Sequence, residues 1–375
     1  MKLLKKRCVA AAAAGTLAAA LLMGCGSSVD DNEVVGTVGE SEISFGVANF
    51  YLRMVQSRYE AYYTTLTGDT PAEFWLQDWD GGTYQESIKK NLVEKLEDLY
   101  LIRQHAQEYD VALTEEEEKA IAKAAADFEE DNSLEAKELV SGHTEYIQEY
   151  LELATIQEKM DEPMKAGVDE DISDEDAAQK SMKYVYFPYV KEDDENSEAI
   201  SDEEKKELKT KAEKFAKDLQ ESEEKDIDAA AKEADLEVET VTFDSDTKAP
   251  NADFMKAADK LKENEVTDAV ESDDGLYVGI VTSLLDREAT DTKKEQIIEE
   301  RKTEQYNSLL KKWREETEIS FNEERWQEID FAYEGVAIPK KEDDAKADND
   351  KKEDSAAEKD ADIEEPGKDS GTEEE

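Results

Sequence analysis

Apolar side chains recur at intervals of three and four residues along much of this chain, which is the spacing of one face of an α-helix. The clearest runs begin near Ile88, Thr114, Tyr146 and Thr292. Thr114 and Glu117 have the spacing of a capping box, and Ser44 precedes another helical run as its N-cap. The pattern therefore predicts a chain that is mainly helical.

Strand-like runs lie in two parts of the chain. The first is a predicted hairpin of Val34–Val38 and Ser41–Ile43, separated by a two-residue turn. The second lies between residues 172 and 290, where β-rich and helical runs follow one another in the order β-α-α-β-α-β. This order is typical of a compact α+β domain. A further extended run, Ile319–Phe321, follows the last long helix.

The N-terminus has the pattern of a secretory signal peptide. Basic residues between Lys2 and Arg7 precede an apolar run, Val9–Leu22, which is short for a membrane-spanning helix. The sequence Leu22-Met23-Gly24-Cys25 then resembles a bacterial lipobox, in which the cysteine is diacylated and begins the mature protein. Because two acyl chains anchor a protein stably, we expect lipidation at Cys25 and a mature chain outside the cytoplasmic membrane. An ordinary secreted protein is the alternative.

Charge excludes one class of partner. The net charge is −53, from 99 acidic and 46 basic residues. Nucleic acid is therefore not expected to bind, because its phosphates require a basic surface. Residues 340–375 hold 16 acidic residues, 7 lysines and almost no large apolar side chain. Such a segment cannot bury a core and is predicted to be disordered.

Cysteine and histidine are too few for several kinds of site. The chain has only Cys8, Cys25, His105 and His143, and Cys8 leaves with the signal peptide. The mature fold is therefore expected to hold no disulfide. Neither a zinc site nor a catalytic triad has the residues it needs, and no acidic loop has the alternating ligands of a calcium site. We expect no metal and no cofactor.

Three stretches of the sequence follow the pattern of one protein family. They are Val35–Ser44 with the aromatic-rich helix after it, Leu92–Glu118, and Phe254–Val281. The first two resemble the hairpin and helices that open the SurA N-terminal domain, and the third resembles the end of a parvulin isomerase domain. Together with the lipobox, they are similar to the lipid-anchored PrsA-type foldases of Gram-positive bacteria and the related SurA-type periplasmic chaperones.

The resemblance implies a helical, SurA-N-like chaperone domain that is discontinuous, with a parvulin-like α+β domain inserted into it. The expected fold class is mainly α and α+β, with a disordered acidic tail. The expected segments are a signal peptide (1–25), a linker (26–33), a first chaperone part (34–171), a parvulin-like domain (172–290), a second chaperone part (291–335) and the tail (336–375).

The expected discontinuous domain predicts which segments pack together. The parvulin-like strands are complete at Val281, and the hairpin near Val34–Val38 is too small to be stable alone. We therefore expect Ile319–Phe321 to pack beside Val34–Val38. The side chains expected to pack on the N-terminal helices are Ile298, Tyr306 and Leu310.

The catalytic positions depart from the family pattern. A parvulin domain normally carries a histidine on its first strand and another on its last, and here Tyr184 and Tyr277 stand at those positions. The Gly-Gly loop that usually precedes Phe254 is also absent. Isomerisation needs an apolar pocket and polar groups that stabilise the twisted amide, and a phenol replaces an imidazole only partly as a donor. We expect activity to be lost; an active peptidyl-prolyl isomerase with a divergent site is the alternative.

Aromatic residues crowd the sequence between residues 50 and 84. Four of them lie where helical periodicity is weak, and we predict that they form an exposed patch that binds clients: Tyr62, Tyr63, Trp75 and Trp79. Ordinary core is the alternative for these four. The leading interpretation is a membrane-anchored extracytoplasmic chaperone or foldase whose partners are unfolded or newly secreted polypeptides. A solute-binding or adhesive lipoprotein is a further alternative, although it would need a two-lobed α/β pattern or repeats.

Overall fold

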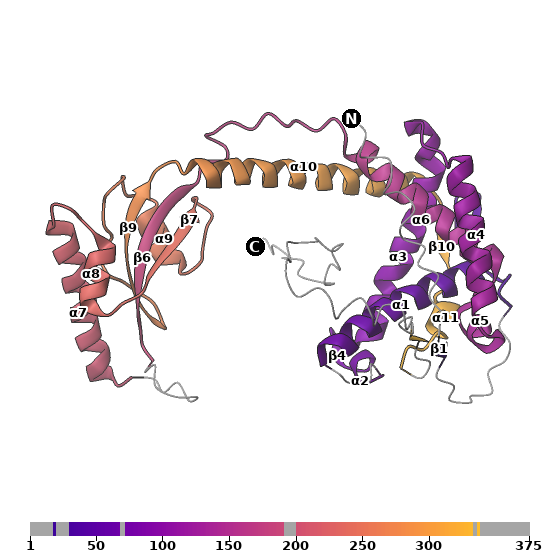
Figure 1. Ribbon diagram of the computed structural model, residues 1–375, viewed down its shortest axis with the longest axis horizontal. Coiled ribbons are helices and arrows are strands. Elements are labelled where there is room, and N and C mark those ends of the chain that lie inside the picture. The colour runs from indigo at the N-terminus through magenta and orange to yellow at the C-terminus, as the bar shows by residue number, and fades with distance from the viewer. Residues whose placement is uncertain (1–17, 20–29, 68–71, 191–199, 333–335, 338–375) are drawn as a thin grey trace, which may run out of the picture. The chain divides into compact units, whose positions relative to one another are not determined.

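The structure is a computed structural model that describes residues 18–19, 30–67, 72–190, 200–332 and 336–337 (Figure 1). The predicted lipid site at Cys25 and the acidic segment beyond residue 337 lie outside these ranges. The chain divides into unit 1, Met1–Ala166 with Gln305–Glu375, and unit 2, Gly167–Glu304. Helices outweigh strands, which confirms the predicted mainly α and α+β class. Within the described ranges, every helix is too short or too polar to cross a membrane.

Unit 1 is built from helices around a small sheet. Its helices are α1 (Phe45–Thr67), α2 (Ala72–Trp75), α3 (Tyr84–His105), the 3-10 helix η1 (Ala106–Tyr109), α4 (Glu115–Asp131), α5 (Leu134–Val140), α6 (Thr144–Lys165), the second part of α10 (Arg287–Glu316) and α11 (Glu323–Gln327). Its strands are β2 (Val34–Val38), β3 (Ser41–Ser44) and β10 (Ile319–Phe321), with the short pairs β1 (Ala18–Ala19) and β11 (Val336–Ala337), and β4 (Asp78–Trp79) and β5 (Gly82–Thr83).

Segments from both ends of the chain meet in the three-stranded sheet of unit 1, whose order is β10-β2-β3. β10 runs antiparallel to β2, with Ile319 opposite Val38 and Phe321 opposite Gly36. Glycine is needed at position 36, because a Cβ there would lie 2.6 Å from the Phe321 ring. The predicted packing of Ile319–Phe321 beside Val34–Val38 is confirmed.

Two helices of unit 1 begin at the predicted capping residues, and the larger of the two apolar clusters of the unit joins its sheet to its long helices. Thr114 opens α4 with a capping box that includes Glu117, and the Ser44 hydroxyl accepts the Val47 N–H at the start of α1. The sheet, α1, α3 and α6 all contribute to the core, and Tyr306 and Leu310 of α10 pack against it as predicted. The same prediction is wrong for Ile298. This half-buried residue lies in the part of α10 that belongs to unit 2.

Unit 2 is an antiparallel sheet covered by helices. Its elements are β6 (Lys180–Pro188), α7 (Asp202–Glu221), α8 (Ile227–Ala234), β7 (Val238–Phe243), α9 (Ala252–Ala258), β8 (Val270–Glu271), β9 (Gly275–Ser283) and the first part of α10. The strand order is β7-β6-β9-β8. The order found is the predicted β-α-α-β-α-β with one addition, the two-residue strand β8 before the last strand.

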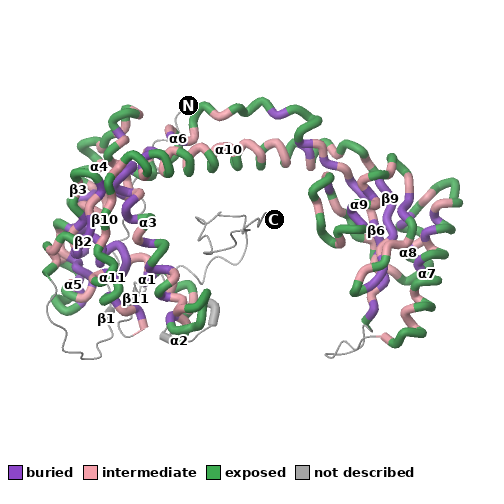
Figure 2. Tube along the Cα trace, turned by 180° about the vertical axis from the view of Figure 1, so that it is seen from behind, coloured by how far each residue is buried: buried purple, intermediate pink, exposed green. Residues whose placement is uncertain are grey.

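The central strand β6 is buried on both faces (Figure 2). Val185 and Phe187 belong to the apolar cluster that includes α7 and α8, whereas Met182 and Tyr184 belong to the cluster that includes α9. Alternate side chains of a strand point to opposite faces. The α9 face is therefore the one that carries Tyr184.

Candidate functional site

Four aromatic rings meet on the α9 face of the unit 2 sheet. Phe254 stacks on Tyr277 with ring centroids 5.2 Å apart and meets Tyr184 edge-on at 5.6 Å. The Tyr186 ring stacks on the Tyr277 ring with centroids 4.6 Å apart. The centroids of Tyr184 and Tyr277 lie 6.1 Å apart. The structure thus places close together the two tyrosines that the family resemblance singles out.

Backbone features position Phe254 at the centre of this cluster. The Asn251 side chain accepts the Phe254 N–H at 3.0 Å and begins α9. Gly279 lies opposite Tyr184 in the β6–β9 pair. A Cβ on Gly279 would come within 2.8 Å of the tip of the Phe254 ring, so glycine allows this ring to lie directly on the sheet. Phe254 is fully buried as a result.

The phenols of the cluster are neutral hydrogen-bonding groups. Tyr184 donates its hydroxyl proton to a Glu239 carboxylate oxygen at 2.5 Å. Burial raises the pKa of the Tyr184 phenol, and the bond to Glu239 raises it further. Burial also raises the pKa of Tyr277. Both phenols therefore stay protonated near neutral pH, and the single donor of Tyr184 is already engaged by Glu239.

A groove adjoins this cluster at the end of the sheet. It has a volume of about 810 Å³. Two residues connect it with the aromatic cluster: Tyr186 belongs to the cluster and Glu239 accepts the Tyr184 proton, and both line the groove. Its charged lining consists of five carboxylates and one lysine: Glu204, Glu207, Asp235, Glu237, Glu239 and Lys211. The groove therefore favours cationic over anionic occupants.

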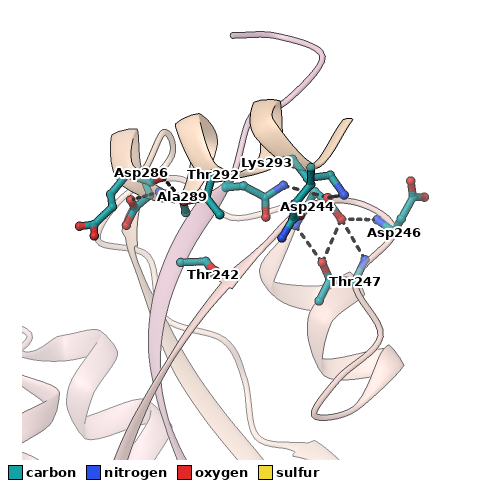
Figure 3. Close-up of a pocket in the computed structure, with 11 residues that line it drawn as sticks. Thr242, Asp244, Asp246, Thr247, Asp286, Ala289, Thr292 and Lys293 are labelled. Atoms are coloured by element: carbon teal, nitrogen blue, oxygen red, sulfur yellow. Dashed lines mark hydrogen bonds and ion pairs between the residues drawn. The ribbon is translucent and has the colours of Figure 1, made fainter. Parts of the chain in front are cut away.

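A second cavity in unit 2 is lined by several polar side chains, with Asp244 at the centre of a hydrogen-bond network (Figure 3). Its volume is about 550 Å³, and it lies between the end of β7 and the first turns of α10. Asp244 accepts hydrogen bonds from the Thr247 N–H and hydroxyl and from the Gln179 amide, at 2.9 to 3.1 Å. These bonds fix the loop after β7.

The aromatic residues near the start of unit 1 form a surface with a buried base. Tyr62, Leu76 and Trp79 are 58%, 49% and 43% exposed, whereas Trp75 is 0% exposed. The prediction of an exposed Trp75 is therefore wrong: its indole N–H donates to Glu60 at 3.0 Å, and its ring packs in the core. Tyr63 is half-buried.

Contacts between rings connect the exposed surface with the core. Tyr63 stacks on Phe74 at 4.7 Å, and Trp79 meets Tyr84 edge-on at 5.4 Å. Phe74 and Tyr84 both contact Trp75. The exposed residues Tyr62, Leu76 and Trp79 are called the aromatic surface here. Of the three, Trp79 is the one whose ring packs on Tyr84 and through it on the buried Trp75. Leu76 shares no motif with the two aromatic residues, so the sequence pattern does not indicate it.

The two histidines lie apart from each other and from the sites described above. His105 stacks on Trp313, and His143 lies 3.7 Å from a Glu129 oxygen, in different parts of unit 1. In the part of the chain that the structure describes, no three His, Cys, Asp or Glu side chains are grouped so that they could hold a metal ion.

Comparison with known proteins gives similarity only at the level of structure. No family model and no curated protein matches the sequence. The foldase PrsA of Streptococcus pneumoniae is 16% identical, with 69% of this chain and 99% of that chain covered and a TM-score of 0.28. The PrsA peptidylprolyl isomerase of Bacillus cereus is 15% identical, with 80% and 100% covered and a TM-score of 0.29.

A third solved structure belongs to another genus. It represents the SurA-like chaperones of Campylobacter jejuni, is 10% identical, and covers 77% of this chain and 99% of its own, with a TM-score of 0.26. These three solved structures are of two PrsA foldases and a SurA-like chaperone.

Proposed function

We propose that this protein is a membrane-anchored extracytoplasmic chaperone that holds unfolded segments of newly secreted proteins on the aromatic surface of unit 1. Its lipid anchor would be Cys25, and its parvulin-like unit 2 would have little or no isomerase activity. The sequence motifs that resemble the PrsA and SurA families support this proposal, as does the pairing of β10 with β2 across the inserted unit.

The observation that carries the proposal is the exposure of Tyr62, Leu76 and Trp79. Large apolar side chains that gather on a surface mark an interaction site. Tyr and Trp suit many partners, because they supply large contact areas at a low cost in conformational entropy. Because Trp79 already packs on Tyr84, which contacts the buried Trp75, less ordering of this side chain is needed when a client binds.

Substitution of the aromatic surface tests its role in client binding. Trp79→Ala is expected to weaken binding of a chemically unfolded reporter protein by about tenfold, since an interface tryptophan commonly contributes more than 1 kcal/mol. Light scattering measures how far the purified protein suppresses aggregation of the reporter. Leu134→Ala is the matched control, because Leu134 is 62% exposed in the same unit but lies on α5. Equal suppression by Trp79→Ala, Leu134→Ala and the unmodified protein would contradict the proposal.

The arrangement of unit 2 favours loss of isomerase activity. The Tyr184 proton is donated to Glu239, so it is not available to a substrate amide without breaking that bond. Phe254 covers the face of the sheet beside Tyr184 and Tyr277, with ring centroids 5.6 and 5.2 Å from theirs. Active isomerisation is the second candidate, because these residues do converge on one face of the sheet.

A refolding assay separates these two candidates. Uncatalysed prolyl isomerisation takes on the order of tens to hundreds of seconds, and we expect the purified protein to leave that phase of a test protein unchanged. The expected reason is that the Tyr184 hydroxyl already donates its proton to Glu239. Acceleration that is lost in Tyr277→Phe would instead establish an active, divergent isomerase.

The anchor has its own test. Cys25→Ala is expected to abolish lipidation, because the thiol is the acceptor of the diacyl group, and to leave the precursor uncleaved by a lipoprotein-specific peptidase. Palmitate labelling and membrane fractionation measure the result, and Cys8→Ala serves as the control cysteine. Labelling of Cys25→Ala at the level of the unmodified protein would overturn the assignment.

A further inference from the structure

The groove of about 810 Å³ at the end of the unit 2 sheet, called the acidic groove here, is shaped by the register of the strands. The ladder between β6 and β7 ends where Val185 lies opposite Val238. Strand β6 continues to Pro188, which is still paired with β9. The groove lies beside this end of β6, and its other walls come from the N-terminal half of α7 and from the residues that lead into β7.

Apolar side chains form part of the lining of the acidic groove. Ile200, Leu208 and Leu236 pack against the apolar cluster between the sheet and α7, and each is only half-buried. Val190 also lines the groove and is 42% exposed. A ligand with apolar side chains would remove this surface from water, which is favourable. The volume lies within the about 300–1,000 Å³ of typical ligand pockets, so the groove has room for a few side chains.

The charge of the acidic groove is not balanced by neighbouring cations. Within the described ranges, four of its carboxylates form no ion pair with a lysine, arginine or histidine: Glu207, Asp235, Glu237 and Glu239. Other acidic side chains of unit 2 do find such partners. Lys209 donates to Glu271 and Lys183 donates to Asp228, each at 2.6 Å. The groove therefore combines unpaired negative charge with accessible apolar surface.

These two properties together define the chemistry of the occupant. A concave surface lined by charge of one sign concentrates its field and attracts ions of the opposite sign. An inorganic cation would make no use of the apolar side chains. In the part of the chain that the structure describes, these carboxylates are also not grouped as metal ligands. A ligand that carries both cationic and apolar side chains matches the whole lining.

We propose that the acidic groove binds basic segments of unfolded polypeptides, in which lysine or arginine side chains lie next to apolar ones. Charge complementarity selects the basic side chains, and the surface of Ile200, Leu208 and Leu236 accepts their apolar neighbours. This goes beyond the proposed function, because it gives unit 2 a polypeptide site of its own that requires no isomerase activity. It rests on the proposed function only for the source of such segments, which are newly secreted chains.

Peptide binding to the full chain tests the proposal. The probe is a fluorescein-labelled peptide of lysine, leucine and serine, and its counterpart carries glutamate at every lysine position. Fluorescence anisotropy is expected to show binding of the lysine peptide alone. Its affinity should fall as sodium chloride is raised from about 0.05 M to about 0.5 M, because salt screens exposed charges.

A pair of matched variants locates the binding in the groove. Glu207→Gln combined with Glu237→Gln is expected to weaken binding of the lysine peptide about tenfold, a few-fold for each carboxylate. Glu223→Gln combined with Glu224→Gln is the control, because these two glutamates are exposed in the same unit but do not line the groove. The control makes the same change in net charge and should leave the affinity unchanged. All four positions are on the surface, and circular dichroism checks that both variants are folded.

Three results would overturn the proposal. Equal weakening by the groove variant and by the control would mean that the peptide senses only the net charge of the protein. Equal affinity for a peptide with serine in place of leucine would mean that the apolar lining takes no part. Spermine that displaces the peptide at an equal concentration would identify the occupant as a small polycation. The aggregation assay with Trp79→Ala measures a different surface, so its result and this one are distinguishable.

Discussion

A chain that ends at Thr317 is expected to lose the folded core of unit 1. The truncation removes β10 and α11 with the residues that follow them, and β2 then keeps only β3 as a partner. An isolated two-stranded pair is marginally stable at best. Three buried side chains of this segment go as well: Trp326, Ile329 and Phe331. The loss of one large core side chain costs about 3–5 kcal/mol, so losing three is comparable with the about 5–15 kcal/mol that stabilises a typical domain.

Tryptophan fluorescence during urea unfolding measures this effect, because all four tryptophans lie in unit 1: Trp75, Trp79, Trp313 and Trp326. Three of them remain in the truncated chain. A chain that ends at Ala337 is the matched control, since it keeps every described element of unit 1 and removes only the acidic segment. If the chain ending at Thr317 unfolds cooperatively at the urea concentration of the control, β10, α11 and residues 328–332 are not needed for the fold.

The elements predicted best are those whose signal is local. Helical periodicity and capping residues are properties of neighbouring positions, so the starts of α1, α4 and α7 follow from Ser44, Thr114 and Ser201. The β10–β2 pair is different, because Ile319 and Val38 are far apart in sequence. It was predictable because a small hairpin needs a further strand and Ile319–Phe321 had no partner within the inserted unit.

Other features depend on contacts that the sequence pattern does not record. Trp75 lies in weakly periodic sequence, yet tertiary packing buries it completely, whereas Trp79, four residues later, stays 43% exposed. Arg53 and Lys89 would ordinarily be placed on the solvent face of a helix. They are buried because residues 327–331 pack on them, and they donate hydrogen bonds to the carbonyl oxygens of Asp330 and Gln327. Ile298 has the helical spacing of Tyr306 but lies in the part of α10 that belongs to unit 2.

The candidate site in unit 2 also has some features that the sequence indicates and others that depend on tertiary contacts. The family pattern indicates Tyr184 and Tyr277 as the residues at the catalytic positions. Their separation of 6.1 Å depends on the register of β6 with β9, and no sequence signal identified Glu239 as the acceptor of the Tyr184 proton. Glu239 lies on β7, an edge strand that is brought beside β6 only by the fold.

The second large effect is expected at the ion pairs between α10 and α3. The Arg314 guanidinium donates to the carboxylates of Glu97 and Asp98, each at 2.5 Å. The Glu97 side chain is only 8% exposed. Removing one partner of a buried ion pair leaves an uncompensated charge and costs about 3–5 kcal/mol. The Arg314 side chain is 26% exposed, so water partly screens this ion pair. Arg314→Met is therefore expected to lower the unfolding free energy of unit 1 by about 3 kcal/mol, the lower end of that range.

This loss is expected to depend on pH with a definite sign. Burial raises the pKa of Asp98 to about 6, although Arg314 opposes the rise. Without the guanidinium, the pKa of Asp98 in the folded state rises further above its ordinary value. The folded state then binds a proton that the unfolded state releases, so stability falls as the pH rises through this range and is regained as the pH falls. The deficit of Arg314→Met should therefore be larger at pH 7 than at pH 5.

Urea unfolding followed by tryptophan fluorescence measures both effects, since Trp313 is adjacent to Arg314 and is buried in the unit 1 core. Lys312→Met is the matched control, because it makes the same change of charge and side-chain type on the same helix at an exposed position. Exposed charges contribute between about 0 and 1 kcal/mol, so the control should unfold close to the unmodified protein at both pH values. A deficit of Arg314→Met that equals that of Lys312→Met, or that grows as the pH falls, would mean that the Glu97 and Asp98 carboxylates do not depend on Arg314 in the folded state.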